Sequence, residues 1–354
     1  MAFTAISLFS GCGGDTLGME RAGGKVIAFS EINKAAIETH KVNFPDSVLL
    51  MDPDSSATDI TKIPDAVFAE YKNRVNVIFA GFPCQGVSRA GKKKATDPRN
   101  QMFRQFIRAT KAIQPSFIIG ENVTGLLTMK SGVADSDPLL FDVIKDEFKK
   151  IGYELTHKQI EATSVGVPQK RKRILIVGWR AGTHFDVGKF WTTVGDWGAR
   201  QPMPVMRSFV TPSLVNAHPL GAALVPENFH QYALEVASHA TVSGEAHPFV
   251  VLKAGEKLLS CSKRDSPIHS EIIDVDRPSK TIICTYDHQP RLLVGLKRGA
   301  ESWARTLFPD ELKQIQGFPA EFILRGNKKE QVVQVGNAVP PALVEAVARA
   351  LFPT

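Results

Sequence analysis

The sequence predicts an α/β fold built on a mostly parallel β-sheet with helices on both faces. Over the first 180 residues, short runs of consecutive apolar residues alternate with segments of helical periodicity. The apolar runs are nearly continuous, which is typical of strands buried on both faces. Several of these runs lead into a glycine-rich turn or an acidic residue, as expected at the ligand-binding edge of a parallel sheet.

The expected elements follow one another along the chain. A strand at 6–9 leads into the glycine-rich turn 11–14, and a helix at 16–22 ends at Gly23-Gly24. A second strand, 26–29, ends at Glu31. The same pattern predicts further strands at 75–80, 117–119 and 173–177, a helix at 103–113, and a helix with the apolar face 140–151 that is capped by Asp137-Pro138.

The sequence pattern changes near residue 186, where prolines become frequent and the periodicity of apolar residues weakens. Seven of the nine histidines lie between 184 and 288, without a metal-binding spacing. We therefore expect a sheet domain over 1–185, a smaller irregular domain over 186–300, and a hinge with a C-terminal helix over 301–354. The segment 334–341 is expected to form a rigid turn, after which an apolar helix packs back on the first domain.

Composition limits the class of protein. A length of 354 residues suggests about two domains, and 43% hydrophobic residues suffice to bury a core. The excess of 43 Lys and Arg over 36 Asp and Glu gives a net charge of +7, which favours an anionic partner. Four cysteines without a C-x-x-C pair predict neither a disulfide framework nor a metal site. The sequence has no apolar run long enough for a membrane helix and no secretory-signal pattern.

The glycine-rich turn 11–14 is the first candidate ligand site. Glycines after a strand let a ligand approach the backbone closely. Glu31 follows Gly11 by 20 positions, a spacing that suits a carboxylate on ribose hydroxyls. Thr16 breaks the G-x-G-x-x-G pattern, which favours a mononucleoside over a dinucleotide ligand, although a tight packing turn is the alternative. Asp59-Ile60, expected near the end of a third strand, is a candidate contact for adenine.

Two further strand ends carry chemistry-bearing residues. Cys84 follows Pro83 after the expected strand 75–80, and the stretch 89–104 carries a net charge of +5 that would favour its thiolate. A buried structural cysteine beside a solvated basic loop is the alternative. Glu121 ends another strand and would face the same edge. The charged run 169–173 enters a strand, so at least one of its side chains is expected to point towards the sheet.

Taken together and in this order, these segments resemble the cytosine-5 DNA methyltransferase family. The resemblance covers nearly the whole chain apart from roughly residues 186–270. The segments that carry it are 9–14, Glu31, Asp59-Ile60, 81–85, 121–123, 169–173, Arg277 with Thr281, 316–319 and 336–341.

The resemblance implies a class I methyltransferase fold, Rossmann-like, with a small target-recognition domain. It implies transfer of a methyl group from S-adenosylmethionine to carbon 5 of cytosine in a specific duplex DNA sequence, with S-adenosylhomocysteine as product. Cys84 would be the nucleophile, Glu121 would contact the target base, and Arg171 and Arg173 would support the catalytic site. The cofactor would lie against Phe9, Gly11, Cys12, Gly13, Gly14, Glu31, Ile32, Asp59, Ile60, Pro83, Asn337 and Ala338.

The resemblance also implies a DNA interface. The target base must be flipped out of the duplex, and the basic stretch 89–104, with hinges at Gly86 and Gly91, would close over it. The lysines at 92–94 would hold phosphates without reading sequence. The expected DNA-binding residues are Gln85, Ser88, Arg89, Lys92, Lys93, Lys94, Arg99, Arg277 and Thr281.

Three alternatives stay open at this point: an RNA (tRNA) cytosine-5 methyltransferase, a catalytically silent DNA-binding homologue, and a Rossmann oxidoreductase. The tRNA branch of the family differs from this sequence in the segment around the cysteine, 81–85, which favours DNA as the substrate. The intact set of Cys84, Glu121 and the arginines argues against the silent homologue and, with the imperfect glycine pattern, against the oxidoreductase. We expect a monomer, functionally paired with a restriction endonuclease. The expected location is the cytoplasm of a bacterial cell or virus-infected host, or the nucleus in a eukaryote.

Overall fold

The centre of the protein is a mostly parallel sheet. The structure, a computed structural model, describes residues 2–83, 101–132, 136–219, 249, 271–287, 292–298 and 301–353. Within these residues seven strands form the sheet in the order β3-β2-β1-β4-β5-β8-β6, and β8 runs in the direction opposite to the other six. The strands are β1 (Phe3–Leu8), β2 (Gly24–Ser30), β3 (Val48–Leu49), β4 (Val77–Ala80), β5 (Phe117–Asn122), β6 (Tyr153–Glu161) and β8 (Lys172–Arg180).

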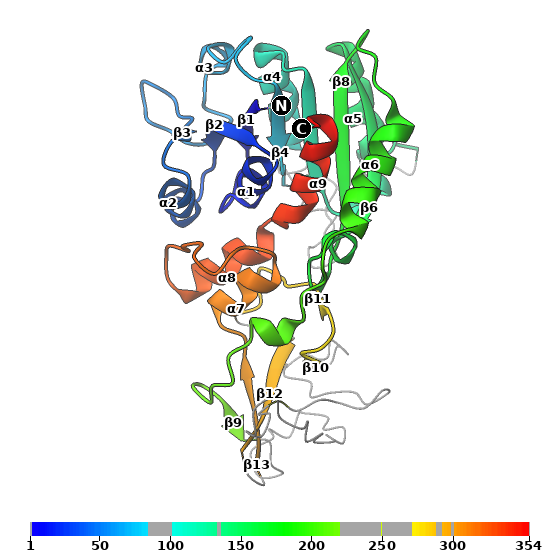
Figure 1. The fold of residues 1–354 in the computed structure, drawn as a ribbon. Coiled ribbons are helices and arrows are strands. Elements are labelled where there is room, and N and C mark those ends of the chain that lie inside the picture. The colour runs from blue at the N-terminus through cyan, green and yellow to red at the C-terminus, as the bar shows by residue number, and fades with distance from the viewer. Residues whose placement is uncertain are drawn as a thin grey trace.

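Helices cover both faces of this sheet (Figure 1). One core cluster joins α1 (Gly14–Arg21), α6 (Val187–Ala199) and α9 (Pro341–Leu351) to one face. A second cluster joins α3 (Asp65–Ala69), α4 (Phe103–Ile113) and α5 (Leu140–Lys150) to the other face. Helix α2 (Lys34–Asn43) packs beside β2 and β3. The predicted fold class is confirmed.

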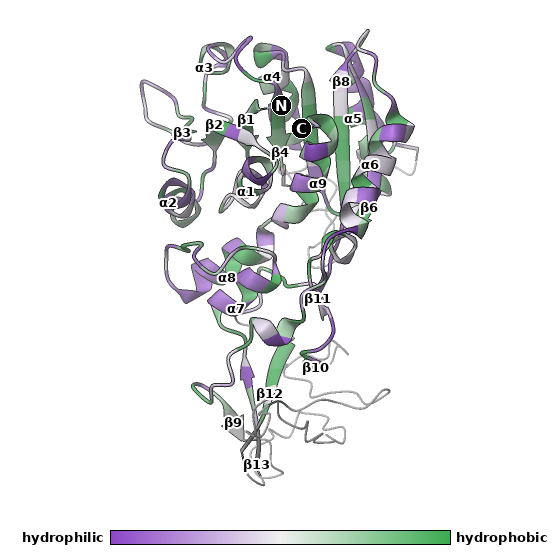
Figure 2. Cartoon of the chain, in the orientation of Figure 1, coloured by the Kyte–Doolittle hydropathy of each residue, from purple (hydrophilic) through white to green (hydrophobic). Residues whose placement is uncertain are grey.

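The continuous apolar character of the strands follows from this double cover. In β4, Val77 and Phe79 join the cluster under α9, whereas Ile78 and Ala80 join the cluster under α4. All four side chains are buried, and the central strands are correspondingly hydrophobic (Figure 2). Among the described residues, no helix combines the length and the apolar character that a bilayer span requires.

A smaller lobe extends below the carboxyl ends of the parallel strands (Figure 1). Its sheet has the order β10-β12-β13-β9, and the separate pair β7–β11 connects this lobe to the segment just before β8. Buried side chains of α7 and α8 belong to the core of this lobe. The bounds are β7 (Gln169–Lys170), β9 (His218–Pro219), β10 (Glu271–Ile272), β11 (Ser279–Lys280), β12 (Leu292–Arg298), β13 (Glu301–Thr306), α7 (Pro309–Ile315) and α8 (Lys328–Asn337).

The chain returns to the first lobe through α9. This helix packs along α1, and Phe352 after it stacks on Phe3 with ring centroids 4.1 Å apart. The two described ends of the chain therefore lie together on one lobe, as the apolar pattern of 342–351 predicted. The expected domain limits at 186 and 300 stay predictions, although α6 packs with α9 and the β12–β13 hairpin spans residues 292–306.

Three local predictions were wrong. The α5 helix begins after an extended Leu139 without a side-chain cap, because backbone hydrogen bonds to 129–131 fix that turn instead of Asp137-Pro138. The third strand lies at 48–49, and Asp59 lies in a later turn. Residues 334–337 belong to α8 rather than to a turn, because Asn327 and Glu330 form a capping box that starts a helix with a buried face.

Candidate active site

The glycine turn between β1 and α1 forms one side of the candidate site. The backbone enters the left-handed region at Phe9 (φ 56°), Gly11 (φ 55°) and Gly13 (φ 91°). Such conformations are strained for a non-glycine residue such as Phe9 and are found preferentially at functional sites. At Gly14 the reason for glycine is contact, since a Cβ there would collide with the carbonyl oxygen of Val339.

Glu31 is held against this turn by backbone donors. The amide of Gly11 donates to Glu31 Oε2 at 2.7 Å, and the amides of Ile32 and Asn33 donate to Oε1, each at 2.8 Å. The carboxylate is thereby fixed at the end of β2, directly beside the glycine turn. Next to it the side chain of Ile32 is 63% exposed, so an apolar surface lies beside the fixed carboxylate.

The other expected cofactor residues lie at the same edge with different exposures. Phe9 packs against the core cluster that contains Ile60, and Asp59 uses Oδ1 to accept from the Thr61 amide at 2.9 Å. Cys12 is fully buried, and its thiol donates to the Gln334 carbonyl at 3.8 Å. Burial raises the pKa of Cys12 to about 12, so the thiol is neutral and its side chain faces the core.

The segment after β4 lies between the glycine turn and β5. The Gly81 amide donates to the Leu8 carbonyl at 3.3 Å, and Asn122 Nδ2 donates to the Phe82 carbonyl at 3.0 Å. Pro83, which precedes Cys84 in the sequence, is the last described residue of this segment. The predictions for Cys84, Gln85, Ser88, Arg89, Lys92, Lys93, Lys94 and Arg99 lie outside the described residues.

Glu121 and Arg173 form a buried ion pair at the ends of β5 and β8. Glu121 Oε1 lies 2.8 Å from Arg173 Nε, and the side chains are only 11% and 14% exposed. Burial raises the pKa of Glu121, and the charges of Arg173 and Arg171 oppose that rise. Although the pair is close, Oε1 receives no well-aligned hydrogen bond within the described residues. A buried acceptor in that state is typical of a position where a ligand binds.

Arg171 joins three distant parts of the chain. Its side chain is 2% exposed, and its guanidinium donates to the carbonyls of Ile282, Gly336 and Ala338, each at 3.1 Å. Burial lowers its pKa well below the usual value. The prediction that a side chain of 169–173 points inwards is confirmed. Its contacts hold the segment that contains the expected cofactor residues Asn337 and Ala338, of which Asn337 is exposed.

Arg277 and Thr281, two of the expected DNA-binding residues, differ in their contacts. Thr281 Oγ1 donates to the Lys170 carbonyl at 2.8 Å, next to the β7–β11 pair. Arg277 is exposed and its Nε lies 3.2 Å from Asp274 Oδ2. Thr281 therefore attaches the small lobe to the segment 169–173, whereas Arg277 faces solvent.

Sequence reasoning gave no role to two buried glutamines that complete the site. Gln169 Nε2 donates to Gln316 Oε1 at 2.5 Å, and Gln316 Nε2 donates to the Ala338 carbonyl at 2.6 Å. Gln169 Oε1 also accepts from the Ile282 amide at 3.0 Å. Both lie in segments that carry the family resemblance, 169–173 and 316–319, and that resemblance was the available signal. Sequence reasoning also gave no role to Asp15, a buried acidic residue directly after the glycine turn.

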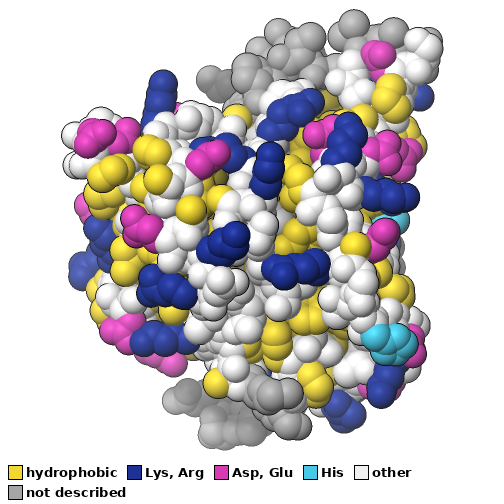
Figure 3. All heavy atoms as spheres, turned by 90° about the horizontal axis from the view of Figure 1, so that it is seen from above, with side chains coloured by type: hydrophobic (Ala, Val, Ile, Leu, Met, Phe, Trp, Pro, Cys, Tyr) yellow, Lys and Arg dark blue, Asp and Glu magenta, His cyan; other side chains and the backbone are white. Residues whose placement is uncertain are grey.

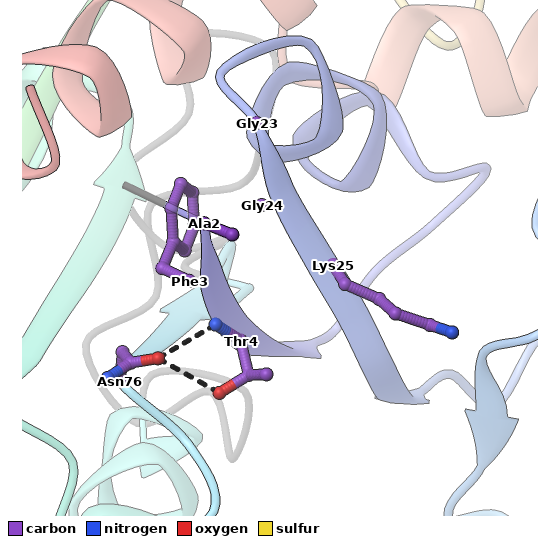
Figure 4. Close-up of a pocket in the computed structure, with 7 residues that line it drawn as sticks. All are labelled: Ala2, Phe3, Thr4, Gly23, Gly24, Lys25 and Asn76. Atoms are coloured by element: carbon purple, nitrogen blue, oxygen red, sulfur yellow. Dashed lines mark hydrogen bonds between the residues drawn. The ribbon is translucent and has the colours of Figure 1, made fainter. Parts of the chain in front are cut away.

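Two other surfaces lie away from this site. A shallow pocket at the amino ends of β1 and β2 is lined by Phe3, Gly24 and Lys25, among others, and holds the hydrogen bonds of Thr4 to Asn76 Oδ1 at 2.8 and 3.0 Å (Figure 4). The end view of the molecule shows Lys and Arg side chains spread over this face, with Asp and Glu side chains near several of them (Figure 3). The described residues that line the pocket include no carboxyl, thiol or imidazole group, unlike those at the carboxyl edge.

The comparisons with known proteins agree with this geometry. The family model described as C-5 cytosine-specific DNA methylase matches residues 3–353. Type II methyltransferase M1.HphI of Haemophilus parahaemolyticus is 32% identical over 362 residues, covering 99% of this chain and 87% of its own length. Type II methyltransferase M.Eco47II of Escherichia coli is 28% identical over 365 residues, covering 99% of this chain and 78% of its own length.

A solved structure supports the fold. The methyltransferase EhMeth of Entamoeba histolytica has a TM-score of 0.65 at 15% identity, with 99% of this chain and 98% of that chain covered. The seven-strand order of the described residues, with its antiparallel β8, is that of the class I methyltransferases. Because the family model spans nearly every residue and the site geometry fits it, the chain belongs to the C-5 cytosine-specific DNA methylase family.

Proposed function

We propose that this protein transfers a methyl group from S-adenosylmethionine to carbon 5 of cytosine in a specific duplex DNA sequence. The buried Glu121–Arg173 pair carries the proposal, because it places an acid and a cation at the strand edge that also holds the glycine turn. Family membership and the similarity to Type II methyltransferases support DNA as the substrate.

The residues at the glycine turn fit S-adenosylmethionine. The turn leaves open space beside Gly11, the fixed Glu31 carboxylate is available for ribose hydroxyls, and Ile32 offers an apolar surface for adenine. The hydroxyl of Ser10, in the turn itself, is buried without a partner among the described residues, as expected where a polar ligand completes the contacts. Bound S-adenosylmethionine supplies the electrophilic methyl group.

Cytosine carbon 5 is too weak a nucleophile to react unaided, so the chain has to activate the ring. The Cys84 thiolate adds to carbon 6, and the ring electrons move towards carbon 5. Burial raises the pKa of Glu121, which favours its role as the acid that assists ring nitrogen 3 and makes this addition easier. Arg173 stabilises negative charge on the base carbonyl. After carbon 5 has gained the methyl group it loses its proton, the S–C bond breaks, and the thiolate returns.

Arg171 acts as a positioning residue for the groups that bind the base and the cofactor. Arg171 binds carbonyls of the segment 336–338 and of Ile282, so the catalytic arginine segment, the cofactor segment and the small lobe meet at one guanidinium. The target base reaches the site by flipping out of the duplex. We propose that 85–99 supplies phosphate contacts and that Arg277 and Thr281 belong to the recognition side.

The remaining assignments follow from the packing. We propose that the first lobe includes α6, since α6 packs with α9. We propose that the small lobe extends through α8 to residue 337, since buried side chains of α7 and α8 belong to the core that also contains β12. We further propose a monomer that acts in the cytoplasm of a bacterial cell and is paired functionally with a restriction endonuclease. The similarity to Type II methyltransferases supports that pairing.

The test is transfer of a radiolabelled methyl group from S-adenosylmethionine to duplex DNA. The expected result is label in DNA that bisulfite sequencing places on cytosine carbon 5 in one sequence context. Cys84→Ala abolishes the transfer, whereas Cys261→Ala, the matched control at another cysteine, leaves it unchanged. Label in RNA alone, or tight DNA binding with no transfer by the unchanged protein, contradicts the proposal.

A further inference from the structure

A buried carboxyl group lies directly behind the glycine turn. Asp15 is in the first turn of α1 and is 2% exposed. Its Oδ2 accepts a hydrogen bond from Ser7 Oγ, and Ser7 is fully buried in β1 at the centre of the sheet. Ser7 has β2 on one side, opposite Phe29, and β4 on the other, opposite Phe79. The carboxyl group therefore lies between the sheet and the turn that the cofactor would occupy.

Within the described part of the chain, Asp15 has no positively charged partner. Glu121 on β5 adds a repulsive charge, and Glu31 lies beyond the turn, on the side of Cys12. Other titratable neighbours carry no positive charge, since burial lowers the pKa of His40 on α2 to about 3 and keeps the thiol of Cys12 protonated. On α9, Glu345 is paired with Arg349 at 2.9 Å.

A buried ionised carboxylate without a cation is costly, so either a proton or an external cation has to compensate it. Burial raises the pKa of Asp15 to about 7, while the hydrogen bond from Ser7 and the backbone amide of Thr16 oppose the rise. Both the protonated and the ionised form are therefore available near neutral pH. A cation bound on the turn would favour the ionised form.

We infer that Asp15 recognises the positive charge of the methyl donor on the glycine turn, so that the turn prefers the sulfonium cofactor over its demethylated product. The inference rests on the proposed function, which puts S-adenosylmethionine there. The donor carries one positive charge more than S-adenosylhomocysteine, and a fixed negative charge behind the turn acts on that difference alone. Donor binding would release the proton of Asp15, and loss of the charge on methyl transfer would favour product release.

The test compares two unreactive ligands by isothermal titration calorimetry on the full chain. Sinefungin carries an ammonium group in place of the sulfonium, and S-adenosylhomocysteine is neutral at that atom. The affinity ratio of sinefungin to S-adenosylhomocysteine is expected to rise about tenfold between about pH 6 and about pH 8. Sinefungin binding near pH 7 should release protons, which is measured in buffers of different ionisation enthalpy.

Variants separate this electrostatic role from a structural one. Asp15→Asn should give a low affinity ratio that no longer changes with pH, whereas Asp46→Asn, an exposed aspartate paired with Lys25, should behave like the unchanged protein. Ser7→Ala should move the midpoint of the change to higher pH, because the Ser7 hydrogen bond favours the ionised form. Circular dichroism and the thermal unfolding midpoint establish that each variant is folded.

The outcomes are distinct. A ratio that does not change with pH in the unchanged protein overturns the inference without any variant, and it leaves the proposed function standing because both ligands still bind. An unchanged ratio in folded Asp15→Asn overturns it equally and leaves Asp15 as a structural link between β1 and α1. Failure of both ligands to bind the unchanged protein overturns the proposed cofactor and, with it, this inference.

Discussion

The contacts of Arg171 predict a large loss of stability when its side chain is removed. Arg171→Ala deletes the donors to the carbonyls of Ile282, Gly336 and Ala338. Ala338 keeps the Gln316 donor at 2.6 Å, so the variant leaves two carbonyls without the side-chain donor that served them. An unsatisfied buried polar group costs about 1–3 kcal/mol, so the free energy of unfolding should fall by about 2–6 kcal/mol.

Urea unfolding followed by circular dichroism measures this loss, and Arg277→Ala is the matched control. Arg277 is an exposed arginine paired with Asp274, and an exposed ion pair of that kind contributes at most about 1 kcal/mol. S-adenosylhomocysteine affinity should also fall in Arg171→Ala, because the segment 336–338 loses its support. A loss below about 1 kcal/mol, or equal losses in the two variants, would refute this assignment of Arg171.

Two further variants test the base site and the DNA interface. Glu121→Gln should slow methyl transfer at least about 100-fold. Because burial raises the pKa of Glu121, the protonated form that assists nitrogen 3 is present below that pKa and is lost as pH rises through it, so single-turnover rates of the unchanged protein should show an alkaline decline that Glu121→Gln lacks. Changing Lys92–Lys94 to glutamine should weaken DNA binding on all sequences alike. The slope of log affinity against log salt concentration should become shallower by the amount expected for about three lost phosphate contacts. A changed sequence preference in that triple variant, measured by fluorescence anisotropy, would contradict non-specific phosphate contact.

The sheet and the glycine turn could be predicted because their signals are local. The apolar run that forms β4 consists of consecutive residues, and the glycines of the turn all lie within 11–14. Glu121 could be predicted for the same reason, since it ends such a run. Its ion pair with Arg173 could not, because it depends on β8 lying antiparallel beside β5.

The parts of the site that could not be predicted from the sequence depend on contacts between distant segments. Gln169 and Gln316 are 147 positions apart, and no pattern around either glutamine indicates that they meet. The hydrogen bond between Ser7 and Asp15 required the helix α1 to fold back over β1. The extent of α8 through residues 334–337 could not be predicted, because its buried face belongs to the core of the small lobe, whose other members come from across the chain.

The most direct test of the central claim is covalent trapping of the protein on DNA. Duplex DNA in which 5-fluorocytosine replaces cytosine, incubated with the protein and S-adenosylmethionine, should give a stable adduct, because fluorine at carbon 5 cannot leave as a proton does. Peptide mass spectrometry should place that adduct on Cys84, and Cys84→Ser should form none. If the protein binds both this DNA and the cofactor yet no adduct forms, the proposed reaction at carbon 6 is contradicted.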